Sequence, residues 1–367
     1  TIAPADFQTV YTGNVIFKWK EIDGCGRYNL QIATDGNFNN ILTDTIVNST
    51  SASVILEDGT YFWRIRTDVG QFNNAKKLVV SSIGSISNLV AWYSADSVHL
   101  TADNHVDILY DKSGNERHAI QQTAGKQPEW IESDEYINGQ PTLFFNGSNG
   151  LSVNFKESMP QPNSVFVVWK QNTTSVATCF TGSSTTPCNQ LYYNGGTSIY
   201  AGRALTSLHK APFNHSFFQV NFNGETSALY INGIQVCKGD AGTQVTNGLT
   251  IGLHANGSMG VTGNISELIF FNGAISSADS AAVMDYLQGK YSDKQLTIDH
   301  RIPVDYGFAP VTYTAECDWA LSFLWDDGTV GPTVVISDEK THFLTVTDKF
   351  GFASSDFIVV DYPKILQ

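Results

Sequence analysis

The chain has 367 residues, of which 42% are hydrophobic, 12% aromatic and 15% charged. Its 35 acidic and 21 basic residues give a formal net charge of −14, which phosphate backbones and anionic membrane surfaces would repel. Composition therefore argues against nucleic acid as a partner, and the longest apolar runs are too short for a membrane span. The length predicts two or three domains. Because the chain begins at Thr1 without Met, we expect a processed or excised piece of a longer product.

The first predicted module covers residues 1–82. Its apolar residues alternate with period two in short segments bounded by Gly, Asn or Asp, which is typical of antiparallel strands. These segments are 14–20, 27–35, 51–56 and 60–67. Their length and spacing predict a small Greek-key sandwich.

A corner in this first module resembles the fibronectin type III family. The stretch "LEDGTYFWRIRT" starts with Leu56 before a turn into an aromatic strand, and Trp19 matches the buried Trp of that family. By spacing from Leu56, the corner tyrosine of the family falls on Phe62, which has no hydroxyl. The hydroxyl that would bond back to the backbone is then missing, unless the neighbouring Tyr61 supplies it.

The second predicted module covers residues 86–292, after the small polar join "SSIGSISN". Alternating segments are separated by Asn-Gly dipeptides, which tolerate positive φ and favour tight hairpin turns. These dipeptides are Asn138-Gly139, Asn146-Gly147, Asn194-Gly195, Asn223-Gly224 and Asn232-Gly233. The pattern predicts a two-sheet jelly roll.

Across residues 86–292 the chain resembles the laminin-G-like/concanavalin A-like lectin superfamily. The resemblance rests on "AWY", "DKSGN", "NGQP", "FNGS" and "ALYINGIQV", in this order. It implies a recognition module, and it implies that a last strand and a short helix close the domain.

One amphipathic helix is predicted at the end of this module. Ser276 and Asp279 form a capping pair, and Val283, Leu287 and Tyr291 lie on one face. We expect this face to pack on the sandwich, without a role in ligand binding.

The third predicted module covers residues 296–367 and again consists of strand-like segments. The stretch "LWDDGTVGPTVVISDEKTHFLTVTDKFGFASSDFIVV" resembles Ig-like, polycystic-kidney-type repeats, which implies a spacer or an assembly contact. Altogether the predicted fold is all-β: a Greek-key Ig/fibronectin-like sandwich, a concanavalin A-like jelly roll with one terminal helix, and an Ig-like sandwich.

The five cysteines have no metal-binding spacing. Cys179 and Cys188 flank a short loop, which leaves two interpretations open: a disulfide in an oxidising compartment, or two small buried thiols.

Catalytic motifs are missing from the sequence. It has no zinc-protease, nucleophile-elbow or phosphate-loop pattern. Concanavalin A-like glucanases carry Glu-x-Asp-x-x-Glu on one strand, but after Glu132 and Asp134 the third position is Ile137. We therefore predict that the chain is not an enzyme.

Ligand-binding candidates gather around a tyrosine-rich hairpin. Aromatic faces, amides and hydroxyls are the groups that bind sugars. The candidates are Tyr192, Tyr193, Asn194, Tyr200, Arg203 and His254. Strand alternation would bury either Tyr192 or Tyr193, but not both.

A calcium ion is a second candidate ligand, because laminin-G-like sandwiches often hold one with side-chain and backbone oxygens. The candidate ligands are Asp111, Asn115, Asn146 and Asn149. The alternative interpretation is that Asp111 and Asn115 only bond turn amides.

These features predict an extracellular, non-catalytic recognition or adhesion protein, on a bacterial surface or secreted. The lectin-like module would bind glycans or a host or neighbouring cell surface, and Ig-like modules would act as spacers. One alternative is a structural virion component (a fibre, capsid decoration or tail protein), in which case a homotrimer is expected. A second alternative is a set of accessory modules of a polysaccharide-degrading enzyme.

Overall fold

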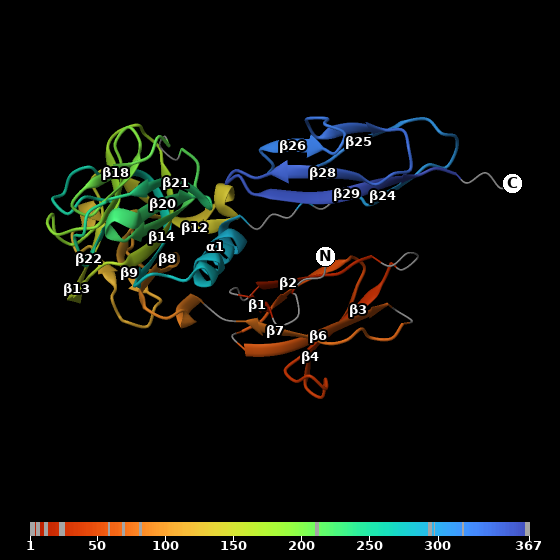
Figure 1. The fold of residues 1–367 in the computed structure, drawn as a ribbon, viewed down its shortest axis with the longest axis horizontal. Coiled ribbons are helices and arrows are strands. Elements are labelled where there is room, and N and C mark those ends of the chain that lie inside the picture. Colours follow the sequence, from red (N-terminus) through yellow and green to blue (C-terminus); the bar gives the residue numbers. More distant parts are fainter. Residues whose placement is uncertain are drawn as a thin grey trace. The chain divides into compact units, whose positions relative to one another are not determined.

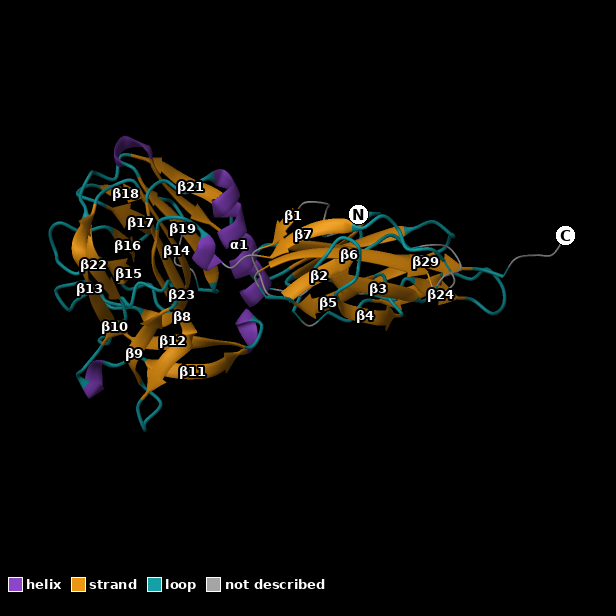
Figure 2. Cartoon of the chain, turned by 90° about the horizontal axis from the view of Figure 1, so that it is seen from below, coloured by secondary structure: helices purple, strands orange, loops and turns teal. Residues whose placement is uncertain are grey.

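The chain is all-β except for one α-helix, as predicted (Figures 1 and 2). The computed structural model describes residues 4, 8–10, 14–21, 26–57, 59–67, 70–80, 83–209, 213–292, 296, 298–317 and 319–363. Within these ranges the only α-helix is α1 (Ser277–Tyr291). No helix of the described residues is long and apolar enough to cross a membrane.

The chain divides into two compact units. One comprises Thr1–Leu89 with Ile275–Gly289, and the other Val90–Ala274 with Lys290–Gln367. The predicted boundaries near residues 82 and 292, and the division into three modules, stay predictions.

The first unit contains a five-stranded sheet, in the order β1-β7-β6-β3-β4, and the separate pair β2-β5. The strands are β1 (Gln8–Val10), β2 (Asn14–Lys18), β3 (Tyr28–Ala33), β4 (Ile41–Val47), β5 (Ser51–Ile55), β6 (Gly59–Thr67) and β7 (Lys76–Val80). Trp19 lies in their common core with Phe17, Leu30 and Trp63. The predicted corner bond also forms: Tyr61, not Phe62, donates its hydroxyl to the Glu57 carbonyl at 2.9 Å.

The second unit contains a 16-stranded sheet that folds back on itself. Its hydrogen-bonded path is β18-β17-β16-β15-β22-β13-β10-β9-β8-β23-β14-β19-β20-β21, and β12 joins β23 and β11. The strands are β8 (Leu89–Leu100), β9 (Val106–Asp111), β10 (Ala119–Ile120), β11 (Glu129–Asp134), β12 (Gln140–Asn146), β13 (Leu151–Met159), β14 (Asn163–Gln171), β15 (Ala177–Thr181), β16 (Gln190–Tyr193), β17 (Thr197–Tyr200), β18 (Ala204–Thr206), β19 (Ser216–Phe222), β20 (Ser227–Ile231), β21 (Ile234–Gly239), β22 (Thr246–Ile251) and β23 (Thr262–Asn272).

A single large core lies between the two layers of this sheet. It includes Trp169 of β14 and Phe218 of β19 from one layer, and Tyr193 of β16 and Ile251 of β22 from the other. Because side chains alternate along a strand, the neighbours of these residues point to the two outer faces.

Four of the five predicted Asn-Gly turns join paired antiparallel strands in this unit. The prediction is wrong for Asn146-Gly147, which leads from β12 to β13, because these two strands pair with other strands and not with each other. Asn232 and Gly233 have φ of 49° and 79°, and they join β20 to β21 as a two-residue loop between the paired residues Ile231 and Ile234. Positive φ at both positions is what a type I′ turn requires, because its twist matches that of the strands.

The helix begins as its capping pair predicts. Asp279 donates its backbone N–H to Ser276 Oγ at 3.0 Å, and the Ser276 hydroxyl donates to Asp279 Oδ2. Val283, Leu287 and Tyr291 are all buried, as expected for the apolar face.

Residues 296–363 form smaller sheets with their own core around Trp325. The strand orders are β24-β29-β28-β26 and β25-β27. The strands are β24 (Arg301–Pro303), β25 (Val311–Thr314), β26 (Ser322–Trp325), β27 (Thr333–Ile336), β28 (His342–Thr347) and β29 (Ala353–Asp361).

Of the two interpretations of Cys179 and Cys188, the structure shows two buried thiols and not a disulfide. Cys179 and Cys188 are both buried, and each is a free thiol. Burial raises the pKa of both thiols, so the neutral form is favoured. Cys25 lies outside the described residues.

Candidate functional site

The tyrosine-rich hairpin consists of β16 and β17, paired antiparallel. Tyr193 enters the core, whereas Tyr192 is half-buried on the outer face, so only one of the two is buried, as the alternation predicted. Tyr200 pairs with Gln190, two residues from Tyr192, which places both tyrosines on the same outer face. The structure therefore brings Tyr192 and Tyr200 together and separates Tyr193 from them.

Amide and hydroxyl groups surround the two outer tyrosines. Gln190 donates from Nε2 to Thr178 Oγ1 at 3.0 Å, and Ser198 donates to Thr206 Oγ1 at 2.9 Å. These polar side chains hold one another in place across β15–β18. Neither the Tyr192 nor the Tyr200 hydroxyl has a hydrogen-bond partner among the described residues.

The remaining predicted ligand residues do not join this face. Asn194 is exposed in the β16–β17 turn. Arg203 forms an ion pair with Asp240, and its side chain is 70% exposed. His254 lies in the connection between β22 and β23, where its Nδ1 accepts from the Asn256 backbone at 3.3 Å. Within the described part of the chain, no hydrogen bond, ion pair or cation–π contact links Arg203 or His254 to the two tyrosines.

The first pair of calcium candidates does not fit a metal ion. Asp111 Oδ1 accepts from the backbone N–H groups of Trp92 and Ser113, and Oδ2 accepts from the Ser113 hydroxyl and the Arg117 N–H. These four donors fill the carboxylate, so it has no oxygen lone pair left for a cation. Asn115 donates its side-chain amide to the Val90 carbonyl of β8 and to the Ser113 hydroxyl of the turn.

The side-chain oxygens of the second pair of calcium candidates also accept hydrogen bonds within their own turn. Asn149 Oδ1 accepts from the Asn146 N–H, and Asn146 Oδ1 accepts from Ser148. In the described residues no group of three or more His, Cys, Asp or Glu side chains could hold a metal. The alternative interpretation, that Asp111 and Asn115 only bond turn amides, fits Asp111. Asn146 and Asn149 likewise accept from backbone N–H groups of their own turn.

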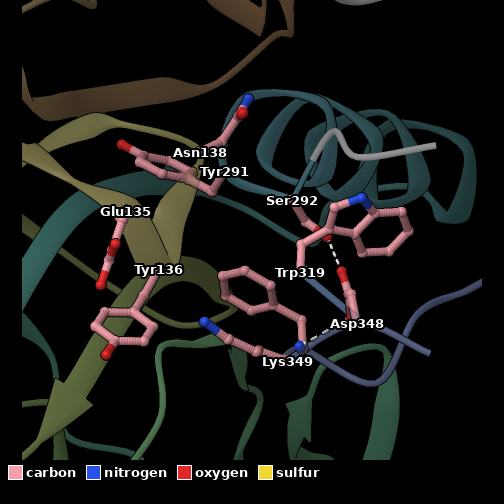
Figure 3. A pocket seen from close by; sticks show the side chains of 9 residues that line it. Glu135, Tyr136, Asn138, Tyr291, Ser292, Trp319, Asp348 and Lys349 are labelled. Atoms are coloured by element: carbon pink, nitrogen blue, oxygen red, sulfur yellow. Dashed lines mark hydrogen bonds between the residues drawn. The ribbon is translucent and has the colours of Figure 1, made fainter. Parts of the chain in front are cut away.

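A cleft that the sequence did not reveal lies elsewhere in the second unit (Figure 3). Its volume is about 380 Å³, and a neighbouring cavity of about 250 Å³ shares Tyr136, Lys349 and Phe350 with it. The larger cleft is lined by Glu135, Tyr136, Asn138, Tyr291, Ser292, Trp319, Asp348, Lys349 and Phe350. Aromatic rings and polar groups thus alternate around one hollow, as in many ligand sites.

One wall of the cleft is the short helix η3 (Glu135–Ile137). Asp134 caps it by accepting from the Tyr136 N–H at 2.9 Å, and Asn138 ends it in the left-handed conformation, with φ of 59°. This tight turn leaves Tyr136 49% exposed. The second oxygen of Asp134 lies 3.0 Å from Nε2 of the buried His215, which lines the neighbouring cavity.

The opposite wall is the turn from Asp348 to Phe352, between β28 and β29. Asp348 accepts from the backbone N–H groups of Phe350 and Phe352, and it also accepts from the Ser292 hydroxyl. Phe350 stacks on Phe217 with ring centroids 4.4 Å apart, which anchors the turn on the outer face of β19. The Asp348 carboxylate therefore accepts three hydrogen bonds from groups beside the cleft.

Comparisons with known proteins find no matching family model and no matching curated protein. Among solved structures, the chain is similar to domain 4 of AbnA, an extracellular arabinanase from Geobacillus stearothermophilus, in complex with arabinotriose. The TM-score is 0.42 and the identity 19%, over 56% of this chain and 100% of that one. An arabinofuranosidase complexed with arabinofuranosyl-α-1,2-xylobiose aligns at a TM-score of 0.43 and 13% identity, over 92% of this chain and 75% of that one.

A third similar structure is the ligand binding domain of botulinum neurotoxin serotype D in complex with N-acetylneuraminic acid. Its TM-score is 0.39 and its identity 13%, with 73% of each chain covered. The three neighbours are thus carbohydrate-binding or carbohydrate-active proteins. Because every TM-score is below 0.5, no residue role or activity is carried over from them to this chain.

Proposed function

We propose that this chain is an extracellular, non-catalytic carbohydrate-recognition protein that binds glycan on the outer face of β16 and β17. The observation that carries the proposal is the pair Tyr192 and Tyr200, which share one polar outer face. Partly exposed tyrosine rings offer apolar faces for the C–H groups of a sugar. Their hydroxyls can both donate hydrogen bonds to a saccharide and accept them from it.

The geometry favours recognition over chemistry at this face. Glycoside hydrolysis needs two carboxyl groups on either side of the scissile bond, whereas the side chains on this face are tyrosines, hydroxyls and an amide. The ligand class that fits best is a neutral polysaccharide lying across the hairpin.

The test is a glycan array with the whole chain, followed by titration of the best ligand against the double variant Tyr192→Ala/Tyr200→Ala. We expect the double variant to bind at least roughly tenfold more weakly, because each lost ring contact is worth about 0.5–1.5 kcal/mol beyond its buried area. Tyr306→Ala is the matched control, because Tyr306 is 95% exposed and lies in residues 296–363.

Two outcomes would contradict the proposal: no binding to any glycan, or full affinity in the double variant. A native-mass measurement separates the proposal from the assembly alternative. A monomer with saturable sugar affinity supports recognition, whereas an obligate trimer without sugar affinity supports a structural virion component.

A further inference from the structure

Two lysines converge on the ring of Tyr136, which lines both the cleft of Figure 3 and the neighbouring cavity. Lys349 Nζ lies 3.9 Å from the centroid of this ring, and Lys170 Nζ, which lines only the neighbouring cavity, lies 5.5 Å from it. Lys170 extends from the outer face of β14, and Lys349 from the turn after β28. Three distant segments therefore place two positive charges beside one aromatic ring.

Neither ammonium group has a carboxylate within ion-pair distance among the described residues. This is notable in a chain with 35 acidic and only 21 basic residues, where carboxylates are abundant. Both lysines are partly buried. An anion bound near both ammonium groups would be attracted by two positive charges that no carboxylate pairs at short range.

Three carboxylates near the cleft could compete for the two lysines. Asp134 is bound to His215 and to the Tyr136 N–H, although Lys170 contributes to the field that stabilises its charge. Asp348 is occupied by the Ser292 hydroxyl and by the two amides of its own turn. Glu135 is exposed at the rim. The positive charge beside Tyr136 is therefore compensated only in part.

A nitrogen in the wall of the smaller cavity also has no partner. His215 Nε2 faces the Asp134 carboxylate, so we assign its proton to Nε2, which makes Nδ1 an acceptor. Nδ1 is buried and has no hydrogen-bond partner.

We propose that this cleft is a second binding site, which takes the acid group of an anionic saccharide. Lys170 and Lys349 hold the charge, the Tyr136 and Trp319 rings contact the sugar, and Asn138 and Ser292 bond its hydroxyls. The cleft of about 380 Å³ with its neighbour of about 250 Å³ falls within the range of small-ligand sites. The proposal for this cleft does not depend on the proposed glycan face of β16 and β17, so either proposal can be refuted without the other.

The experiment titrates the whole chain with three oligosaccharides of equal length: trigalacturonate, a sulfated galactan oligosaccharide and neutral galactotriose. We expect at least one acidic ligand to bind roughly tenfold or more tightly than the neutral one, because bonds to charged groups are the stronger ones. The acidic ligand that binds identifies carboxylate or sulfate as the recognised group. Added salt should weaken this binding, because the charges are only partly buried.

Variants then locate the site. Lys170→Gln and Lys349→Gln should each weaken acidic-ligand binding by about tenfold. Lys340→Gln removes the same charge from a side chain that is 81% exposed, and it should have no effect. Tyr192→Ala/Tyr200→Ala should also leave this binding unchanged, which separates the second site from the hairpin face. Unchanged thermal unfolding of each variant confirms that its fold is intact.

Three results would overturn this proposal. The first is that neither acidic ligand binds. The second is that galactotriose binds the Tyr192→Ala/Tyr200→Ala variant as tightly as the acidic ligands do. The third is that both lysine variants keep wild-type affinity.

Discussion

Replacing Lys290 by Met should destabilise the second unit strongly, because it leaves a buried carboxylate without its cation. Lys290 Nζ donates to Glu267 Oε2 at 2.8 Å, to Asp96 Oδ2 at 2.7 Å and to Ser94 Oγ at 2.7 Å. The Glu267 side chain is completely buried, and that of Lys290 is 12% exposed. Burial acts to lower the pKa of Lys290, but Glu267 and Asp96 outweigh it and raise this pKa, so Lys290 is charged.

The loss of stability depends on the hydrogen bonds that Glu267 keeps in the variant. Removing one partner of a buried ion pair costs about 3–5 kcal/mol. Glu267 still accepts from Trp92 Nε1 at 2.6 Å and from the Tyr291 hydroxyl at 2.5 Å, so we expect the low end, about 3 kcal/mol. For a unit of this size, that lowers the melting temperature by roughly 6–12 °C.

Scanning calorimetry is the appropriate assay, because it can resolve the transitions of separate units. The matched control is Lys112→Met, which breaks a half-exposed pair with Asp96 and should cost only about 0.5 kcal/mol. The double variant Glu267→Gln/Lys290→Met should be more stable than Lys290→Met alone, since no buried charge is left unpaired. A loss below about 1 kcal/mol for Lys290→Met would refute this reasoning.

Three further predictions concern pH, packing and the corner of the first unit. Burial lowers the pKa of His215 below its unfolded value of 6.5. The neutral imidazole therefore contributes its full stability above pH 6.5, and this contribution is lost as the pH falls below 6.5. His215→Gln should reduce the pH dependence of the melting temperature measured across this range. Gly252→Ala should lower the free energy of unfolding by more than about 3 kcal/mol, measured by denaturant unfolding, because the added Cβ would lie 2.2 Å from the buried Phe145 ring. Gly257 has a similar positive φ but open space around it, so Gly257→Ala should lower this free energy by only about 1 kcal/mol. Tyr61→Phe removes the corner hydroxyl bond and should cost the first unit about 1 kcal/mol by the same method; an unchanged stability would mean that water replaces the bond.

Local patterns predicted the parts of the fold that depend on neighbours in sequence. The Ser276 cap and the Asn232-Gly233 hairpin both follow from bonds or dihedral angles within a few residues. Strand alternation likewise separated Tyr192 from Tyr193. Each of these features has a local physical cause, so one sequence was sufficient to predict it.

The calcium candidates and the cleft show where such reasoning stops. The same Asp and Asn residues can bind a cation or cap a turn, and only the positions of the amides around Asp111 decide between the two. The cleft needs Tyr136, Trp319 and Lys349 from segments far apart in the chain. The turn capped by Asp348 places Lys349 over the ring of Tyr136, which lies more than two hundred positions earlier in the chain. Neither segment alone contains a pattern that predicts this contact.

The two proposed sites should act independently, because they lie on opposite outer faces of the jelly roll. Tyr193 and Trp169 belong to one core, so Tyr192 and Lys170, their neighbours along each strand, point away from this core in opposite directions. A short ligand that occupies one site should therefore lose affinity only when that site is changed, whereas a long polysaccharide that engages both sites gains avidity from the second one. Long chains should then bind more tightly than short ones in the wild type, and this advantage should disappear when either site is removed. A length advantage that survives the loss of either site would place both effects in one continuous surface.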